Sequence, residues 1–314
     1  MPQTLIIQAI RDETDRIRVF DLTAPEGAAL PNWAAGAHLT FELGEVGTRC
    51  YSLIRWPGVD DPACYTIAVQ REDDGDGGSR KMHALAVGDR ITAQGPKNDF
   101  ELRDHPGPAL LLAGGIGLTP MISMATALHG ANRPFRLVYA ARSADVMGFA
   151  NPLQSAFGTG VTLRYDDTAP LDLDALMGTL TPDTHLYICG PKGMIDAART
   201  AATAGGQSED QIHIELFTNS ASVDGDTAFE VEISSTGAVY TVPPGKTIID
   251  VLEAEGIDLI YDCQRGDCGI CQTDVISGTP DHRDVVLSDA EKASGTLMQI
   301  CVSRAKSDRL VLDL

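Results

Sequence analysis

The chain is poor in positive charge and lacks features that would place it in several other protein classes. Its 314 residues include 44 Asp and Glu but only 24 Lys and Arg, a formal net charge of −20. Nucleic acids and anionic membranes would repel such a chain, so we expect neither as a partner. Residues 1–10 lack a basic start and lead directly into Arg11, Asp12 and Glu13. We therefore expect no signal peptide and a cytoplasmic location.

The sequence also lacks an uninterrupted hydrophobic run that could span a membrane, although one segment is free of charged residues over a sufficient length. Residues 106–132 contain no Asp, Glu, Lys or Arg, and their length would suffice to cross a membrane. Gly114, Gly115, Gly117 and Pro120 interrupt this segment. The pattern favours a buried strand, a glycine turn and a helix packed on a sheet. The sequence has no internal repeats and no low-complexity tract.

The seven cysteines are an odd number and show no disulfide framework. Four of them have the spacing Cys-x4-Cys-x2-Cys with a distant fourth, which is typical of a plant-type [2Fe-2S] site: Cys263, Cys268, Cys271 and Cys301. The alternative is a four-cysteine zinc site, but the second close pair that such sites usually have is missing. Iron-bound thiolates and free thiols imply a reducing compartment.

The residue pattern divides the chain into three domains and a linker. Residues 1–105 contain short β-rich runs separated by turns and predict an antiparallel β-barrel, with one helix over 79–87. Residues 106–217 alternate strands with helices and predict a nucleotide-binding α/β domain with a parallel sheet. Residues 218–227 are small and polar and predict a linker. Residues 228–314 predict a small domain with strands at 229–234, 239–242 and 309–312 and a helix at 247–255.

Two glycine turns follow predicted strands of the α/β domain. The first runs from Gly114 to Pro120, and the second is Cys189-Gly190-Pro191. Ligands of open α/β sheets bind where the carboxyl ends of strands meet, and glycines let a pyrophosphate approach the backbone. The first turn differs in spacing from the GxGxxG fingerprint and lacks an acidic residue about 20 positions later, so a packing role is the alternative. Cys189 alone is interpreted as a buried small hydrophobe.

Two motifs in the first domain suit a phosphate and an aromatic ring. Arg49 and Tyr51 share one face of a predicted strand, followed by Ser52, and an ordinary surface strand is the alternative. Gly77-Gly78-Ser79-Arg80 is a glycine turn that opens a predicted helix. In the last domain, we interpret Asp281-His282-Arg283-Asp284 as a surface charge network rather than a metal or acid–base site.

Together these motifs resemble the phthalate dioxygenase reductase family, which includes the reductase components of vanillate and carnitine monooxygenases, over essentially the whole chain. The resemblance implies an FMN-binding barrel, a nicotinamide-binding domain and a C-terminal β-grasp [2Fe-2S] ferredoxin domain. The domain order implies FMN, because relatives with the ferredoxin at the N-terminus usually carry FAD. NADH is favoured over NADPH, because no second basic residue follows Arg142 closely.

The resemblance also implies roles for individual residues. Flavin contacts are expected at Arg49, Tyr51, Ser52, Ala68, Val69, Gly77, Gly78 and Ser79. Nucleotide contacts are expected at Gly114, Gly115, Ile116, Gly117, Thr119, Arg142, Ser143, Cys189, Gly190 and Pro191. The residues expected beside the reacting rings are Ser52, Cys189, Glu215 and Phe217, with Phe217 covering the flavin.

The family implies the reductase component of a two-component Rieske oxygenase, which passes electrons from NADH through FMN and a [2Fe-2S] cluster to an oxygenase that hydroxylates or demethylates a small organic molecule. The sequence shows no Rieske Cys-x-His pair and no His-and-carboxylate set for a mononuclear iron, so oxygen chemistry is expected in the partner. The alternatives are an electron donor to a cytochrome P450 or another acceptor, and a ferredoxin-like carrier or sensor that does not oxidise NADH. We expect a monomer.

Overall fold

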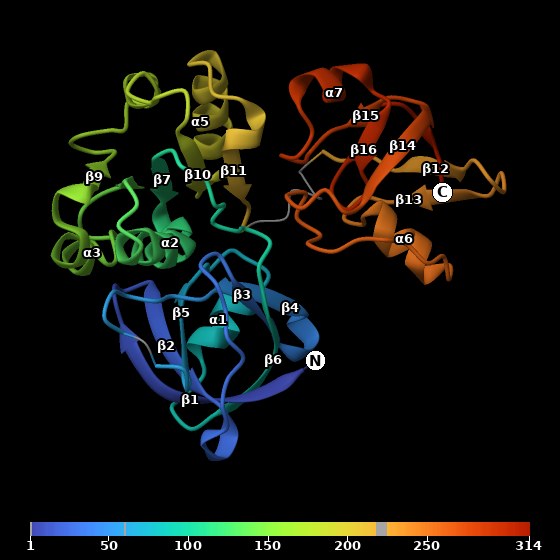
Figure 1. Cartoon of the computed structure of the whole chain (residues 1–314). Helices are drawn as coiled ribbons and strands as arrows, with labels where there is room; N and C mark the ends of the chain where they lie inside the picture. The colour runs from blue at the N-terminus through green and yellow to red at the C-terminus, as the bar shows by residue number, and fades with distance from the viewer. Residues whose placement is uncertain (1, 60, 218–224) are drawn as a thin grey trace. The chain divides into compact units, whose positions relative to one another are not determined.

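The computed structural model describes residues 2–59, 61–217 and 225–314, and the chain divides into two compact units, Met1–Glu215 and Leu216–Leu314 (Figure 1). Most of the predicted linker 218–227 lies outside the described residues. Within the described residues, no helix has the length and apolar character that crossing a membrane requires.

The larger unit begins with a six-stranded antiparallel sheet in the order β4-β3-β6-β1-β2-β5 (Figure 1). Its two edges meet where Leu53, just after β4, bridges Ile67 of β5, and the Ile54 N–H donates to Thr66 O at 2.8 Å. The sheet thus curls into the predicted barrel around a core of its own. The strands are β1 Gln3–Asp12, β2 Ile17–Thr23, β3 His38–Glu42, β4 Thr48–Ser52, β5 Cys64–Gln70 and β6 Arg90–Lys97, with the short helix α1 Gly78–His83.

A parallel five-stranded sheet follows, in the order β11-β10-β7-β8-β9. The segment without charged residues forms β7, which is buried throughout, a glycine turn and helix α2, as predicted. The strands are β7 Ala109–Gly114, β8 Phe135–Ala141, β9 Val161–Tyr165, β10 His185–Cys189 and β11 Ile212–Glu215. The helices are α2 Leu118–Gly130, α3 Ala150–Phe157, α4 Leu173–Met177 and α5 Lys192–Ala204.

Helix α2 joins the barrel to the parallel sheet inside the larger unit. The Ser123 hydroxyl donates to Leu53 O at 2.7 Å and accepts from the Arg55 N–H at 2.9 Å. The Thr126 hydroxyl donates to Arg55 O at 2.7 Å. A shared apolar core includes barrel residues such as Ile17 and α2 residues. The chain leaving β4 is therefore held against α2.

The smaller unit has a mixed five-stranded sheet in the order β13-β12-β18-β14-β16. β12 and β18 run parallel at its centre, and the other pairs are antiparallel, which is the β-grasp arrangement that the family resemblance implied. The strands are β12 Phe229–Ile233, β13 Val239–Val242, β14 Gln272–Ser277, β16 Leu297–Gln299 and β18 Arg309–Leu312, with the small pair β15 Pro280–Asp281 and β17 Arg304–Ala305. The helices are α6 Ile248–Ala254 and α7 Asp289–Ser294.

Candidate functional site

The strand β4 presents the predicted flavin motif on both of its faces. In the β3–β4 register, Phe41 lies opposite Arg49, and Leu39 lies opposite Tyr51. Arg49 and Tyr51 therefore share a face, as predicted, and the Tyr51 ring lies 5.7 Å from the Phe41 ring. Burial raises the pKa of Tyr51 to about 12, with Arg49 acting in the opposite direction. The phenol is neutral at physiological pH.

The glycine turn before α1 lies directly against Arg49. A Cβ at Gly78 would come within 2.6 Å of Arg49 Cγ, so only glycine leaves room for this side chain. Gly77, with φ of +90°, takes the left-handed conformation that glycine favours. The Arg49 guanidinium donates to Val46 O at 3.0 Å and Thr48 O at 2.7 Å. The Ser79 hydroxyl accepts from the Glu72 N–H at 2.9 Å. The structure thus brings Arg49 and Gly77–Ser79 together.

Ser52 is the last residue of β4 and lies on the face opposite Arg49 and Tyr51, where it is only 3% exposed. Among the described residues, its hydroxyl has no hydrogen-bond partner. A buried hydroxyl in this state costs about 1–3 kcal/mol, so the position fits a ligand atom that can share its proton. His38 lies opposite Ser52 in the register and is equally buried, and sequence reasoning missed it. Nothing in the pattern around a single histidine marks it.

The predicted flavin residues of β5 face in opposite directions. Val69 belongs to the barrel core, whereas Ala68 belongs to the core shared with α2. The turn Gly115–Gly117 lies against β5 in the same unit. The shared core also receives Ile116 from that turn. Strand β5 of the barrel and the first glycine turn therefore pack against each other through the shared core.

The two glycine turns of the α/β domain pack directly on each other. A Cβ at Gly117 would lie 2.3 Å from Cys189 O, and one at Gly114 would lie 2.7 Å from Pro191 Cδ. A Cβ at Gly190 would lie 2.9 Å from Gly114 N. Gly115 differs, because its φ is +54° and no atom lies within 4 Å of its added Cβ. Packing therefore explains three glycines, and Gly115 leaves the backbone open to a ligand.

The strand ends beside these turns carry the remaining candidate residues. The register aligns Ala113, Cys189 and Glu215 across β7, β10 and β11 at their carboxyl ends. Cys189 is completely buried and Glu215 is 2% exposed. The Thr119 hydroxyl donates to Ile116 O at 3.1 Å, which closes the first turn.

Three further candidates lie outside this row of strand ends. Arg142 is exposed and follows β8, and the Ser143 hydroxyl lowers the pKa of Asp145 through a hydrogen bond. Phe217 is 38% exposed and belongs to the smaller unit, whereas Glu215 ends the larger one.

In the smaller unit, the four predicted cysteine ligands approach one another. The Cys268 and Cys301 thiols hydrogen-bond to Cys263 and lower its pKa, and the Cys301 thiol likewise lowers the pKa of Cys271. These thiols stand in for the thiolates that would bind iron. Among the described residues, no three His, Cys, Asp or Glu side chains form a site for a single metal ion. The contacts link all four thiols in the order Cys268, Cys263, Cys301 and Cys271, which fits four ligands around one [2Fe-2S] cluster.

The loop between the first three cysteines is held by buried charges. Asp267 Oδ2 accepts from the Leu216 N–H at 3.1 Å and lies 3.3 Å from Arg265 Nε. Burial raises the pKa of Asp267 to about 7, with Arg265 acting in the opposite direction. The Arg265 N–H donates to Cys263 Sγ at 3.3 Å. A backbone N–H thus reaches the sulfur of one predicted cluster ligand, and such a contact would tune a bound cluster.

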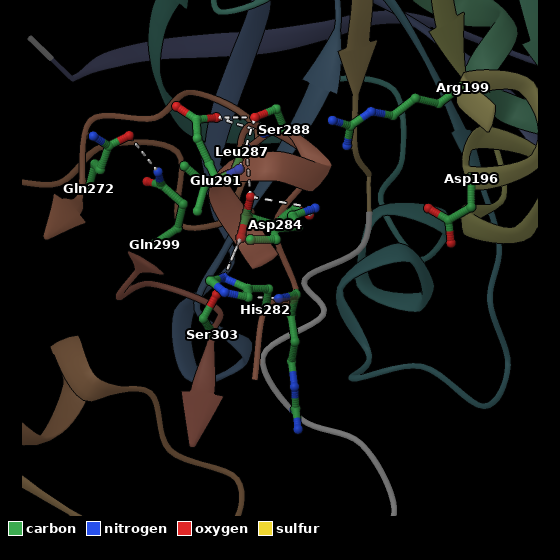
Figure 2. A network of polar contacts seen from close by, with 12 residues as sticks. Asp196, Arg199, Gln272, His282, Asp284, Leu287, Ser288, Glu291, Gln299 and Ser303 are labelled. Carbon is green, nitrogen blue, oxygen red and sulfur yellow. Dashed lines mark hydrogen bonds and ion pairs between the residues drawn. The ribbon is translucent and has the colours of Figure 1, made fainter. Parts of the chain in front are cut away.

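Asp284 connects this loop to the segment that carries the fourth cysteine (Figure 2). Its carboxylate accepts from the Leu287 N–H at 2.8 Å and from the Ser303 hydroxyl at 3.5 Å. Its neighbour Val285 donates its N–H to Gly266 O at 3.0 Å. The Asp284 side chain is completely buried. The expected charge pairs do form within residues 281–284, but our placement of this network on the surface was wrong, because hydrogen bonds inside the unit stabilise the buried Asp284 carboxylate.

A second buried network fixes the start of the smaller unit. Arg283 donates to both carboxylate oxygens of Asp226, at 2.6 and 3.0 Å, and to Asp281 at 2.8 Å. Arg304 lies 3.6 Å from the same Asp226 and donates to Lys246 O at 2.6 Å. Sequence reasoning missed Asp226 because it treated this position as part of the linker.

Comparison with known proteins places the chain in one family. A family model described as a 2Fe-2S iron-sulfur cluster binding domain matches residues 231–306. Phenoxybenzoate dioxygenase subunit beta of Ectopseudomonas oleovorans is 39% identical over 100% of this chain and 98% of its own length. Vanillate O-demethylase oxidoreductase of Pseudomonas sp. is 39% identical over 99% of each chain.

Two solved structures are also similar over the whole chain. The structure of phthalate dioxygenase reductase, described as a modular structure for electron transfer from pyridine nucleotides to [2Fe-2S], has a TM-score of 0.74 and 35% identity and is covered to 98%. Full-length CYP116B46 from Tepidiphilus thermophilus has a TM-score of 0.77 and 34% identity, and this chain matches 42% of it.

Proposed function

The chain belongs to the phthalate dioxygenase reductase family of flavin and iron-sulfur oxidoreductases, and we propose that it is the NADH-dependent reductase component of a two-component Rieske oxygenase. The observation that carries the proposal is the order of three sites along one full-length match: a barrel motif, a pair of glycine turns and a cysteine quartet. FMN accepts a hydride and releases electrons singly, and a [2Fe-2S] cluster carries one electron at a time. The chain's own residues bind and align these groups.

In this proposal the barrel holds FMN. Arg49 and the Gly77–Ser79 turn bind its phosphate, because the Arg49 cation lies directly against this glycine turn. Tyr51 lies along the ring system, and the backbone of Ala68 and Val69 follows it. The Ser52 hydroxyl, buried and unpartnered among the described residues, donates to the flavin ring.

The α/β domain holds NADH at the carboxyl ends of its strands. Gly115 offers its open backbone to the pyrophosphate, supported by Gly114, Ile116, Gly117 and Thr119. Gly190 and Pro191 supply the second contact, and Arg142 with Ser143 lies near the adenosine ribose. Cys189 packs beside the nicotinamide, Glu215 orients the rings, and Phe217 covers the flavin until the nicotinamide replaces it. The cluster is held by Cys263, Cys268, Cys271 and Cys301.

Anaerobic stopped-flow absorbance tests the relay. In Cys271→Ser protein we expect NADH to bleach the flavin at the wild-type rate, because the larger unit is unchanged. Reduction of cytochrome c, a one-electron acceptor, should fall to near background. Undiminished transfer to cytochrome c would contradict the cluster assignment, and a wild-type protein that contains no flavin would contradict the flavin assignment.

The Ser52 role has a separate test. We expect Ser52→Ala to slow flavin reduction by about 100-fold, the lower end of the usual loss for one positioned donor. Cys50→Ala is the matched control, because Cys50 lies two residues earlier on the same face of β4 but is exposed. Equal rates for Ser52→Ala and wild type would remove Ser52 from the reaction.

The partner is a terminal oxygenase that acts on a small organic molecule, and the reductase itself is a cytoplasmic monomer. A second candidate function, electron donation to a cytochrome P450, is favoured by the full-length similarity to part of CYP116B46. Reconstitution with the product of a neighbouring oxygenase gene distinguishes the two: coupled product formation with a Rieske protein supports the first, and with a P450 the second. Light scattering checks the monomer.

A further inference from the structure

A buried glutamine lies beside one of the four cysteines. Gln299 ends β16 and is completely buried, and its side-chain Oε1 lies 3.4 Å from Cys271 Sγ. On its other side, Gln299 Nε2 lies 3.4 Å from Gln272 Oε1, as Figure 2 shows. The β14–β16 register places Gln272 and Gln299 opposite each other. The amide thus has one partner on each side.

The backbone of Gln299 fixes the position of this amide. Gln299 O accepts from the Val302 N–H at 3.3 Å and from the Ser303 N–H at 3.0 Å, which closes the turn that carries Cys301. The following N–H, from Ile300, reaches Cys271 O at 3.4 Å. One residue therefore holds the segment of the fourth cysteine and touches the sulfur of the third.

The chemistry of an iron-bound cysteine determines which end of the amide faces it. With a free thiol, Cys271 donates to Gln299 Oε1. An iron-bound thiolate has no proton and only accepts hydrogen bonds. An amide oxygen facing it would repel it in a buried place, whereas a half-turn of the carboxamide puts the NH₂ group at the same position. Gln272 is exposed and can turn its own amide to donate to the displaced oxygen.

We propose that Gln299 donates an N–H···S hydrogen bond to the iron-bound sulfur of Cys271 and thereby raises the reduction potential of the cluster. This inference rests on the proposed function, because it requires a cluster at these cysteines. Reduction adds negative charge to the cluster and its sulfurs, so a donor stabilises the reduced state more than the oxidised state. Gln299 is a positioning and tuning residue and does not react itself.

The test is a redox titration of the full-length holoprotein with Gln299→Met, which keeps the length of the side chain and removes the donor. At a fixed ambient potential we expect the ratio of reduced to oxidised cluster to fall about tenfold, which corresponds to about 59 mV for one electron. Resonance Raman bands of the iron–cysteine bonds should shift in D₂O for wild type and lose this shift in the variant. Gln272→Met is the matched control and should change the ratio by less than about threefold.

The outcomes separate this inference from the proposed function. A wild-type protein without [2Fe-2S] absorbance would overturn both. A loaded wild type whose Gln299→Met variant keeps its potential and its D₂O shift would overturn the hydrogen bond alone. If the Gln299→Met variant does not hold the cluster, the test uses wild-type protein whose glutamine side chains are labelled with ¹⁵N. Pulsed EPR of the reduced cluster should then show coupling to an amide nitrogen. The Gln272→Met control should retain this coupling, and its absence from the wild type would overturn the inference.

Discussion

The two units differ in where they place charge. Among the described residues of the larger unit, Glu215 is the one Asp, Glu, Lys or Arg that is almost completely buried. The smaller unit, with fewer than half as many residues, buries Arg265, Asp284 and Arg304. Its short strands leave long loops around the cysteines, and ion networks fix these loops. The larger unit positions its site by strand register and by glycines that pack tightly.

A site can therefore be held rigid in two ways, by buried ion networks or by tightly packed glycines, and different substitutions disrupt each. Removing one partner of a buried ion network leaves an unpaired charge, whereas adding one methyl group to a packed glycine forces backbones apart. Variants that damage one unit should therefore leave the other folded. Both tryptophans, Trp33 and Trp56, lie in the larger unit, so their fluorescence reports on that unit alone.

The largest effect should come from Arg304→Met in the smaller unit. This change leaves Asp226 with one partner fewer and removes the donors to four carbonyls, of Thr227, Val242, Pro243 and Lys246. We expect a loss of about 3–5 kcal/mol in the free energy of unfolding of this unit. Thermal bleaching of cluster absorbance measures it, while the tryptophan transition should not move.

Arg309→Met is the control for that experiment. Arg309 pairs with Glu230 at 2.6 Å and Glu232 at 2.9 Å, but its side chain is 45% exposed. An exposed pair contributes about 0–1 kcal/mol. If both variants lost equal stability, burial would not be the property that distinguishes the two networks.

A smaller effect is expected at the glycine turns of the larger unit. Gly117→Ala would place a Cβ 2.3 Å from Cys189 O, and we expect it to cost about 1–3 kcal/mol and to raise the KM for NADH. Gly193→Ala in α5 is the matched change, because no atom lies within 4 Å of its added Cβ; it should stabilise by about 0.5–1 kcal/mol. Urea unfolding followed by tryptophan fluorescence compares them, and a harmless Gly117→Ala would show that the turns can separate.

The smallest effect is a pH dependence of the larger unit. His105 stacks on His185 with ring centroids 3.6 Å apart, and His185 Nδ1 lies 2.9 Å from His213 Nε2. Burial lowers the pKa of His105 and of His213 to about 4, and Arg103 and Arg133 act in the same direction. Because these folded-state values lie below the ordinary 6.5, the stack stabilises fully above pH 6.5.

This contribution is lost as the pH falls from 6.5 toward 4. Both rings are partly exposed, so we expect only about 1–2 kcal/mol. Urea midpoints from tryptophan fluorescence at pH 7 and pH 4.5 measure the loss, and His213→Gln should reduce it. A midpoint difference that His213→Gln leaves unchanged would assign the acid sensitivity to carboxylates instead.

Local patterns predicted most of the fold and part of the site. The two sheets of the larger unit form within the residue ranges 1–105 and 106–217 that predicted them, and the cysteine spacing predicted four thiols that meet. The predicted helix at 79–87 is shorter, Gly78–His83. β14, β16 and α7 were not predicted, because β14 and α7 are short and largely polar and β16 has only three residues.

The contacts that the sequence did not reveal are those between residues far apart along the chain. Asp284 and Gly266, Gln299 and Cys271, and His105 and His185 meet only because segments far apart in sequence lie side by side. No local spacing marks such pairs. The sequence also left the role of Gly117 open between ligand binding and packing. A glycine can make room for a ligand or for a neighbouring backbone, and the sequence alone does not distinguish the two.

The ion pair between Asp226 and Arg283 has a practical consequence for cutting the protein. The family match covers residues 231–306, yet Asp226 lies before it and the central strand β18, Arg309–Leu312, lies after it. A fragment excised at the family borders would remove the Asp226 carboxylate that Arg283 and Arg304 share, and it would leave the sheet without its central strand. A usable electron-transfer module for fusion to other enzymes must therefore start before Asp226 and extend to Leu314.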